Sequence, residues 1–192
     1  MVFASVLGAF FVGLGYLGLQ SLLLDMMVLV CDQPRTALFI HIYLLLITIL
    51  VATYIIDGRP AKSPEKCLRV ICIGVVISHA FAYLSLNWLI GRDLTPLVGS
   101  WAGGILLTLP AATTGMAFGW YFQILLRSNG RHGLLGLIAV SIGALTAALR
   151  AKLLVLEIGS AAAFVLILMS FVAILALIPP PTPPEDRQPS TW

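Results

Sequence analysis

Several ionisable side chains lie inside apolar stretches of this sequence, and four of them form a first group of candidates. They are Asp25, His41, Arg150 and Glu157. Such groups are costly in a membrane-spanning segment, so they are candidates for a ligand site or for a proton or solute path. An ion pair between Asp25 and Arg150 on two helices would offset the desolvation of both charges. The alternative is a purely structural pair, or side chains that reach the membrane interface along their methylene stems.

A second candidate is a polar stripe at i, i+4 and i+8, formed by His79, Tyr83 and Asn87. This spacing places the three side chains on one face of a helix. His79 lies near the middle of its apolar segment, so we expect the stripe to face the interior of a bundle. There it would supply interhelical hydrogen bonds of about 0.6–2 kcal/mol each, or line a proton or solute path.

Other sequence signals of chemistry are weak. Cys31, Cys67 and Cys72 form no CxxC pair and no metal-ligand spacing. We find no glycine-rich phosphate loop, HExxH motif or nucleophile elbow. We therefore predict no catalytic residue, no cofactor and no metal. The predicted polar cluster consists of the seven residues of the two candidate groups: Asp25, His41, His79, Tyr83, Asn87, Arg150 and Glu157.

The elements that must position these residues are membrane-spanning helices. Of 192 residues, 60% are hydrophobic and only 10% are charged, and the mean hydropathy is +1.04. Soluble domains carry about 25% charged residues. At about 20 residues per crossing plus connections, about six crossings fit. The net charge of +3 is too small to indicate a nucleic-acid partner.

Run lengths and helix breakers predict an all-α polytopic bundle of six transmembrane helices. The N-terminal apolar run lacks a basic start and is longer than a signal-peptide core, so we expect it to be a permanent first helix and not a cleaved signal peptide. The last apolar region must reverse, either near Arg150 and Lys152 or, as we prefer, at Gly159-Ser160, where serine would be the N-cap. Pro110 is expected to kink the fourth helix. The predicted helices cover residues 2–30, 35–56, 67–90, 97–126, 133–158 and 160–178. The bundle is thus residues 1–178, and the proline-rich tail, residues 179–192, should be disordered.

The distribution of Lys and Arg predicts the orientation, because cytoplasmic loops carry more of them. One side would hold four: Arg35, Arg92, Arg150 and Lys152. The other side would hold seven: Arg59, Lys62, Lys66, Arg69, Arg127, Arg131 and Arg187. This bias predicts that both termini are cytoplasmic and that the protein is a multi-pass protein of the cell (inner) membrane.

Small residues on the fourth predicted helix are spaced for close helix contacts. The pairs are Gly99 and Gly103, Ser100 and Gly104, and Gly115 and Gly119. We expect these Gly and Ser surfaces to face lipid, where they suit docking against helices of another protein.

Three segments, in the same order, resemble the membrane region of bacterial spermidine-synthase-like membrane proteins. They are Gly13-Leu14-Gly15-Tyr16 with Pro34 and Ala37-Leu38, then Pro110 with Gly115-Met116-Ala117-Phe118, then Asn129-Gly130 with Leu135-Gly136. The resemblance covers residues 13–178 and implies the fold of that membrane module.

The departures from this family bear on function. Where the family has a glutamate, this sequence has Gln20. Where the family has a Gln-Arg pair and a Gly-His pair, this sequence has Asp25-Met26 and Asp32-Gln33. The sequence shows no counterpart of the family's soluble domain, which binds decarboxylated S-adenosylmethionine. The resemblance therefore gives no ground for aminopropyl transfer, and implies a chain that works beside a separately encoded enzyme or in an unrelated membrane complex.

Three functions remain open. The first is a non-catalytic membrane module, a scaffold or accessory subunit whose partners are the lipid bilayer and a membrane protein or separately encoded enzyme. The second is a small-solute or proton-coupled transporter that uses the polar cluster, although no internal repeat is visible. The third, an intramembrane enzyme acting on lipid or quinone, lacks a converging nucleophile and base. We rank them in this order.

Overall fold

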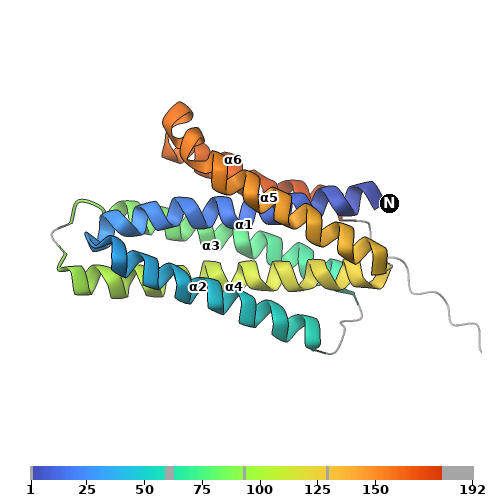
Figure 1. Ribbon diagram of the computed structural model, residues 1–192. Helices are drawn as coiled ribbons and strands as arrows, with labels where there is room; N and C mark the ends of the chain where they lie inside the picture. Colours follow the sequence, from blue (N-terminus) through green and yellow to red (C-terminus); the bar gives the residue numbers. More distant parts are fainter. Residues whose placement is uncertain (1, 59–62, 93, 129, 179–192) are drawn as a thin grey trace, which may run out of the picture.

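The computed structural model describes residues 2–58, 63–92, 94–128 and 130–178, with side chains over the same ranges except at residues 2–5, 127, 128 and 130–132. This part of the chain forms six long helices and no strand (Figure 1). The helices are α1 (Val2–Cys31), α2 (Pro34–Asp57), α3 (Pro64–Leu89), α4 (Pro96–Ser128), α5 (Gly130–Ile158) and α6 (Ser160–Leu177). The proline-rich tail, residues 179–192, lies outside the described residues, as do Arg59, Lys62 and Arg187.

Each of the six helices is long and apolar enough to cross a membrane. The predicted all-α polytopic helical bundle is therefore confirmed, while the orientation of the termini stays a prediction. Helices α2, α3 and α4 begin with Pro34, Pro64 and Pro96. Proline suits the first turn of a helix, because its fixed φ is helical and the N–H that it lacks has no partner there.

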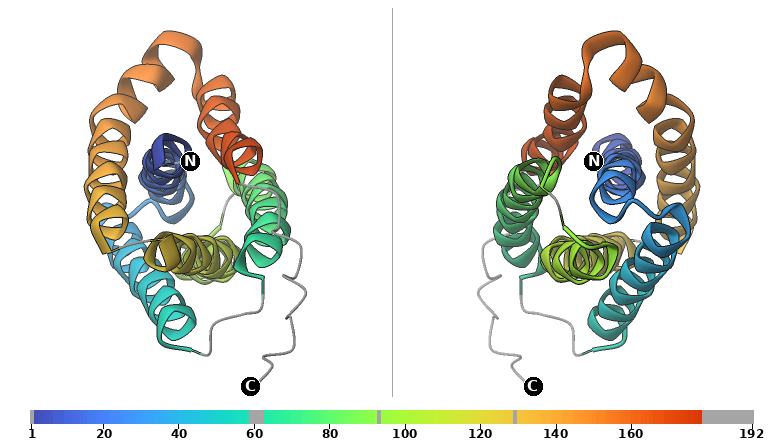
Figure 2. Two further views of the ribbon diagram at one scale, coloured as in Figure 1. Left: turned by 90° about the vertical axis from the view of Figure 1, so that its right-hand side faces the viewer. Right: turned by 90° about the vertical axis from the view of Figure 1, so that its left-hand side faces the viewer.

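Helix α1 lies on the axis of the bundle, with the other five helices around it (Figure 2). It contacts all five of them. In an apolar window of 18 residues within α1, 56% of the residues are buried, against 17–39% in the corresponding windows of the other five helices. A helix that is apolar on every side suits such a central position. The axis of the bundle is therefore filled by protein.

Glycines allow α1 to approach its neighbours closely. A Cβ atom on Gly13 would collide with the backbone carbonyl of Val140 in α5, and one on Gly143 with the carbonyl of Phe10 in α1. On the side of α6, a Cβ on Gly15 would lie 2.6 Å from the ring of Phe171. Such contacts of backbone with backbone are typical of helix pairs in membranes.

The last two helices form a hairpin at Gly159, as predicted. Helix α5 ends at Ile158 and α6 begins at Ser160. The expected cap residue is wrong, because Gly159 takes the N-cap position and Ser160 is already helical. Gly159 has φ +82°, a conformation that costs other residues energy because of their Cβ atom.

We expect Gly159→Ala to destabilise the protein by about 1 kcal/mol. The cost should be conformational only, because a Cβ there would meet nothing within 4 Å. Gly74→Ala is the matched control, since Gly74 lies inside α3 and its Cβ would meet only Thr113 Cγ2 at 4.0 Å. The free energy of unfolding, measured by adding SDS to mild-detergent micelles, should fall for the first variant and stay level or rise for the second. Equal losses would contradict this account of the turn.

Candidate functional site

The predicted polar cluster does not converge on one place. Asp25, Asn87, Arg150 and Glu157 are exposed on the outer surface of the bundle, and His41 and Tyr83 are partly buried. His79 alone is fully buried, with 1% of its surface exposed. Its predicted position inside the bundle is therefore found, but the other members lie on several faces.

Asp25 and Arg150 form no ion pair in the part of the chain that the structure describes. Arg150 and Glu157 instead line a shallow cavity of about 290 Å³ between α1, α5 and α6, and Asp25 is not part of its lining. The predicted contact is absent because α5 and α6 lean away from α1 toward the Gly159 turn (Figures 1 and 2). Asp25 lies in the last two turns of α1, and Arg150 lies in the last third of α5, where a long arginine side chain can extend toward the membrane interface.

The stripe on α3 is not a connected hydrogen-bond path. His79 Nδ1 lies 2.9 Å from the carbonyl oxygen of Val75 in the same helix, so Nδ1 is the donor, and Nε2 carries the lone pair whenever the ring is neutral. The ring of Tyr83 stacks on Phe164 of α6, with centroids 4.2 Å apart. Asn87 donates to the carbonyl of Tyr83 over 3.0 Å. The stripe thus serves the packing of α3 against its neighbours and its own backbone.

His41 faces a narrow gap between helices rather than a path. The gap lies between α1, α2 and α4, is lined also by the buried Gln20, and has no room for a water molecule.

A polar junction that the sequence analysis missed lies around Pro110. Here Thr48 Oγ1 of α2 lies 3.1 Å from the carbonyl oxygen of Ala111 in α4, and Ser78 Oγ of α3 lies 3.0 Å from Thr113 Oγ1 of α4. The Thr113 hydroxyl is also 3.0 Å from the Pro110 carbonyl. We call this group the Pro110 junction, and it ties α4 to both α2 and α3. The signal was present in the two threonines that follow Pro110.

Helix α4 passes through Pro110 without interruption, from Pro96 to Ser128. Proline removes one backbone donor from a helix, and neighbouring hydroxyls commonly compensate in membranes. The hydroxyls of Thr113 and Thr114 bond the Pro110 carbonyl over 3.0 and 2.8 Å. These two bonds are made to the carbonyl of Pro110 itself, whereas the carbonyl that lacks its helical donor is that of Leu106, four residues earlier. Helix α4 does not divide into two half-helices at this point.

Most glycines of α4 face inward, so the expectation that these small residues face lipid is wrong for two of the three pairs, Gly99 with Gly103 and Gly115 with Gly119. The pair of Ser100 and Gly104 instead lines a hollow on the outside of the bundle. Cβ atoms on Gly99 and Gly103 would collide with α1, at the Val30 carbonyl and the Met27 side chain. Cβ atoms on Gly115 and Gly119 would collide with α2. The small residues were correctly expected to mark close contacts, but these contacts lie within the bundle.

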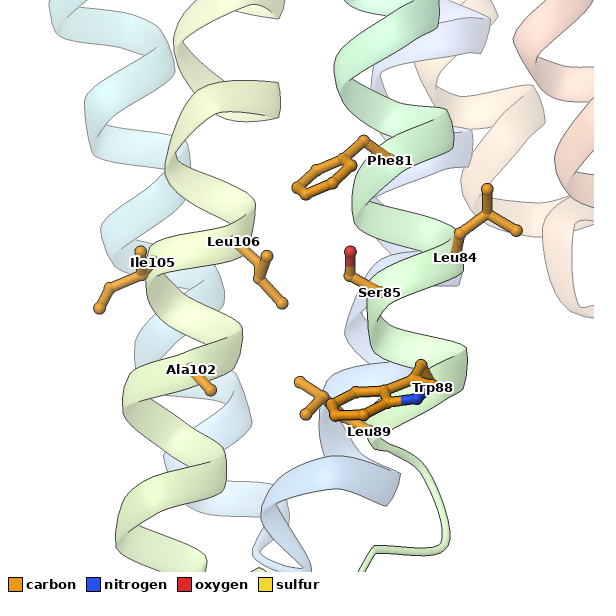
Figure 3. A pocket seen from close by; sticks show the side chains of 8 residues that line it. All are labelled: Phe81, Leu84, Ser85, Trp88, Leu89, Ala102, Ile105 and Leu106. Atoms are coloured by element: carbon orange, nitrogen blue, oxygen red, sulfur yellow. The ribbon is translucent and has the colours of Figure 1, made fainter.

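Two hollows of larger size open on the outer face of α4. One lies between α2 and α4 and measures about 510 Å³; we call it the α2–α4 groove. The other lies between α3 and α4, measures about 660 Å³, and is the α3–α4 groove (Figure 3). Both are lined mainly by apolar side chains. Sequence periodicity could not reveal them, because they depend on how far neighbouring helices diverge.

Among the described residues no three His, Cys, Asp or Glu side chains gather as a metal site would require. Comparisons with protein-family models, curated proteins and solved structures find no match to this chain. The resemblance to the membrane region of spermidine-synthase-like proteins therefore stays a prediction. What the chain does must be inferred from its own geometry.

Proposed function

We propose that the chain is a non-catalytic integral membrane module, a scaffold or accessory subunit that binds a helix of another membrane protein. The observation that carries this proposal is the α2–α4 groove, an apolar hollow on the side of the bundle that faces lipid. We further propose the cell (inner) membrane as its location, with both termini cytoplasmic, from the Lys and Arg bias.

The walls of the groove suit a transmembrane helix. On α4 it is lined by Ser100, Gly104 and Thr108, which follow one another at intervals of four residues. Such small residues let two helix backbones approach closely. The Ser100 and Thr108 hydroxyls bond carbonyls of their own helix over 2.6 and 2.8 Å, so the wall is nearly apolar.

The opposite wall belongs to α2, where only 17% of the residues in an apolar window of 18 are buried. Its aromatic side chains Phe39 and Tyr43 line the groove, as does Trp101 from α4. Large rings beside a row of small residues form a ridge next to a groove, and a helix packs on such a surface. The glycines of α4 that face inward do not contribute, so the surface is limited to this stripe.

Gly104→Leu tests the proposal. A Cβ at this position meets only Ile40 Cγ2 at 3.9 Å, so the variant should fold while its side chain fills the groove. We expect a partner protein that co-purifies stoichiometrically from native membranes in mild detergent to be lost at least about tenfold, because close helix packing is blocked. Ala148→Leu, at an exposed position of α5, is the control and should retain the partner. Equal recovery with both variants would contradict the α2–α4 groove as the docking surface.

A transporter is the alternative function, and the buried His79 beside the Pro110 junction is the observation that favours it. Against it, α1 occupies the axis of the bundle and α4 is continuous, whereas transporter sites commonly use broken helices. A flux assay with the purified protein in liposomes distinguishes the transporter from the membrane module. Flux of protons or a small polar solute that disappears in His79→Leu, with folding intact, would reject the module in favour of the transporter.

A further inference from the structure

We propose that the α3–α4 groove binds one acyl chain of an anionic phospholipid, whose phosphate is held by Arg92 at the end of α3. This site is independent of the α2–α4 groove, although both share Ile105 as a wall. The proposed ligand is a membrane lipid with a net negative headgroup, held more tightly than the lipids around it.

The groove has the size and polarity of a binding site for a hydrocarbon chain. Its volume of about 660 Å³ is within the range of about 300–1,000 Å³ typical of ligand pockets. Phe81 from α3 and Leu106 from α4 point into the space between the two helices, and Trp88 lies at its lower end in the view of Figure 3. From Phe81 to Leu89 the groove extends about 12 Å along α3.

A positive charge lies beside this groove because of how α3 ends. Gly91 has φ +83°, so the chain reverses just after Leu89, and the Arg92 N–H bonds the Leu89 carbonyl over 3.1 Å. The guanidinium carbon of Arg92 then lies 4.3 Å from the centre of the Trp88 ring. The same tryptophan lines the groove. Arg92 is thereby positioned next to the groove at the end of a membrane-spanning helix.

This arrangement matches the two parts of an anionic lipid. A guanidinium that stacks on an aromatic face keeps the N–H donors at its edge available, and their fork fits a phosphate. Tryptophan and arginine near a helix end are at headgroup depth, where the phosphate of a lipid lies. In the described part of the chain Arg92 has no ion-pair partner, while its neighbour Asp93 lies outside that part.

A lipid chain fits this groove better than a partner helix does. The walls carry Phe81, Leu84, Trp88, Ile105 and Leu106, without a row of small residues. Side chains of this size keep a second helix backbone at a distance, whereas a flexible chain can pass between them. The two grooves on α4 therefore take different occupants.

Native mass spectrometry of the purified full-length protein tests the proposal, with phosphatidylglycerol and phosphatidylcholine of the same two acyl chains as ligands. We expect one phosphatidylglycerol to bind about tenfold more tightly than phosphatidylcholine. Arg92→Gln should abolish this preference and leave phosphatidylcholine binding unchanged. Arg35→Gln, which removes a charge from the same end of the bundle, should keep the preference, as should Asp93→Asn.

A second variant tests the acyl-chain half of the site. Ala102→Phe places a ring in the α3–α4 groove and should weaken binding of both lipids, while Ala148→Phe on α5 should not. Glycerol phosphate without acyl chains should fail to displace the bound lipid, which separates a lipid from free phosphate as the ligand. Equal affinity for the two lipids in the unmodified protein, or a preference that survives Arg92→Gln, would overturn the proposal. So would lipid binding that Ala102→Phe leaves intact in a folded variant.

Discussion

Gly13→Leu is expected to destabilise the bundle by about 3 kcal/mol, at the upper end of the range for overpacked sites. Gly13 lies where α1 crosses α5, and its Cβ would collide with the backbone carbonyl of Val140. A backbone carbonyl cannot rotate out of the way as a side chain can, so the two helices must separate. Unfolding by SDS in mild-detergent micelles should show the loss as a lower transition midpoint.

The matched control for this change is Gly104→Leu, the same substitution at a position where a Cβ has space. Its stability should remain within about 0.5 kcal/mol of the unmodified protein, as is usual for surface substitutions. Gly143→Leu should reproduce the effect of Gly13→Leu, since its Cβ meets the carbonyl of Phe10 at the same crossing. The double variant should lose less than the sum of the two, because one separation relieves both collisions. Similar stabilities of Gly13→Leu and Gly104→Leu would disprove the close α1–α5 crossing.

Phe171→Ala is expected to lower the free energy of unfolding by about 3 kcal/mol, because the cavity left behind removes packing contacts. Phe171 is completely buried, and its ring lies against Gly15 of the central helix. In lipid the gain from leaving water is small for packing between helices, so contacts within the bundle supply most of this loss. The same SDS titration measures it.

Leu166→Ala is the control for Phe171→Ala on the same helix. Leu166 is 55% exposed and faces the surroundings of the bundle, so truncating it should change stability little. A large loss of stability in both variants would indicate that α6 is held by its overall apolar character and not by specific packing of Phe171. A small effect of Phe171→Ala would show that α6 does not pack on α1 as described.

The sequence by itself determined the helices. A run of about 20 apolar residues is long enough to cross the membrane. Lipid offers no hydrogen-bond partners, so the backbone N–H and C=O groups of such a run must bond one another, as they do in a helix. Pro34 and Pro96 lie where helices were expected to begin, but α3 begins at Pro64, three residues before its predicted start at residue 67. The chain reverses at Gly159, as expected, because glycine tolerates φ +82°. These are local properties, so they could be predicted from neighbouring residues alone.

The sequence also indicated that His79 would be buried, since an imidazole near the middle of a membrane needs a partner. It did not reveal that the partner is the Val75 carbonyl of the same helix, nor that Tyr83 would stack on Phe164. The i, i+4, i+8 spacing shows which residues share a face. It does not show whether they bond one another, a neighbouring helix or their own backbone.

Only the tertiary structure decided which faces of the helices lie inside. In water, polarity separates the outer face of a helix from the inner one, but in lipid both faces are apolar, so periodicity carries little information. For this reason most glycines of α4 were expected on the wrong side, and the central position of α1 was not foreseen. The Pro110 junction, the two grooves on α4 and the fold of Arg92 onto Trp88 likewise depend on contacts between segments distant in sequence. Packing between helices determines these contacts, because any apolar helix face is solvated equally well by lipid.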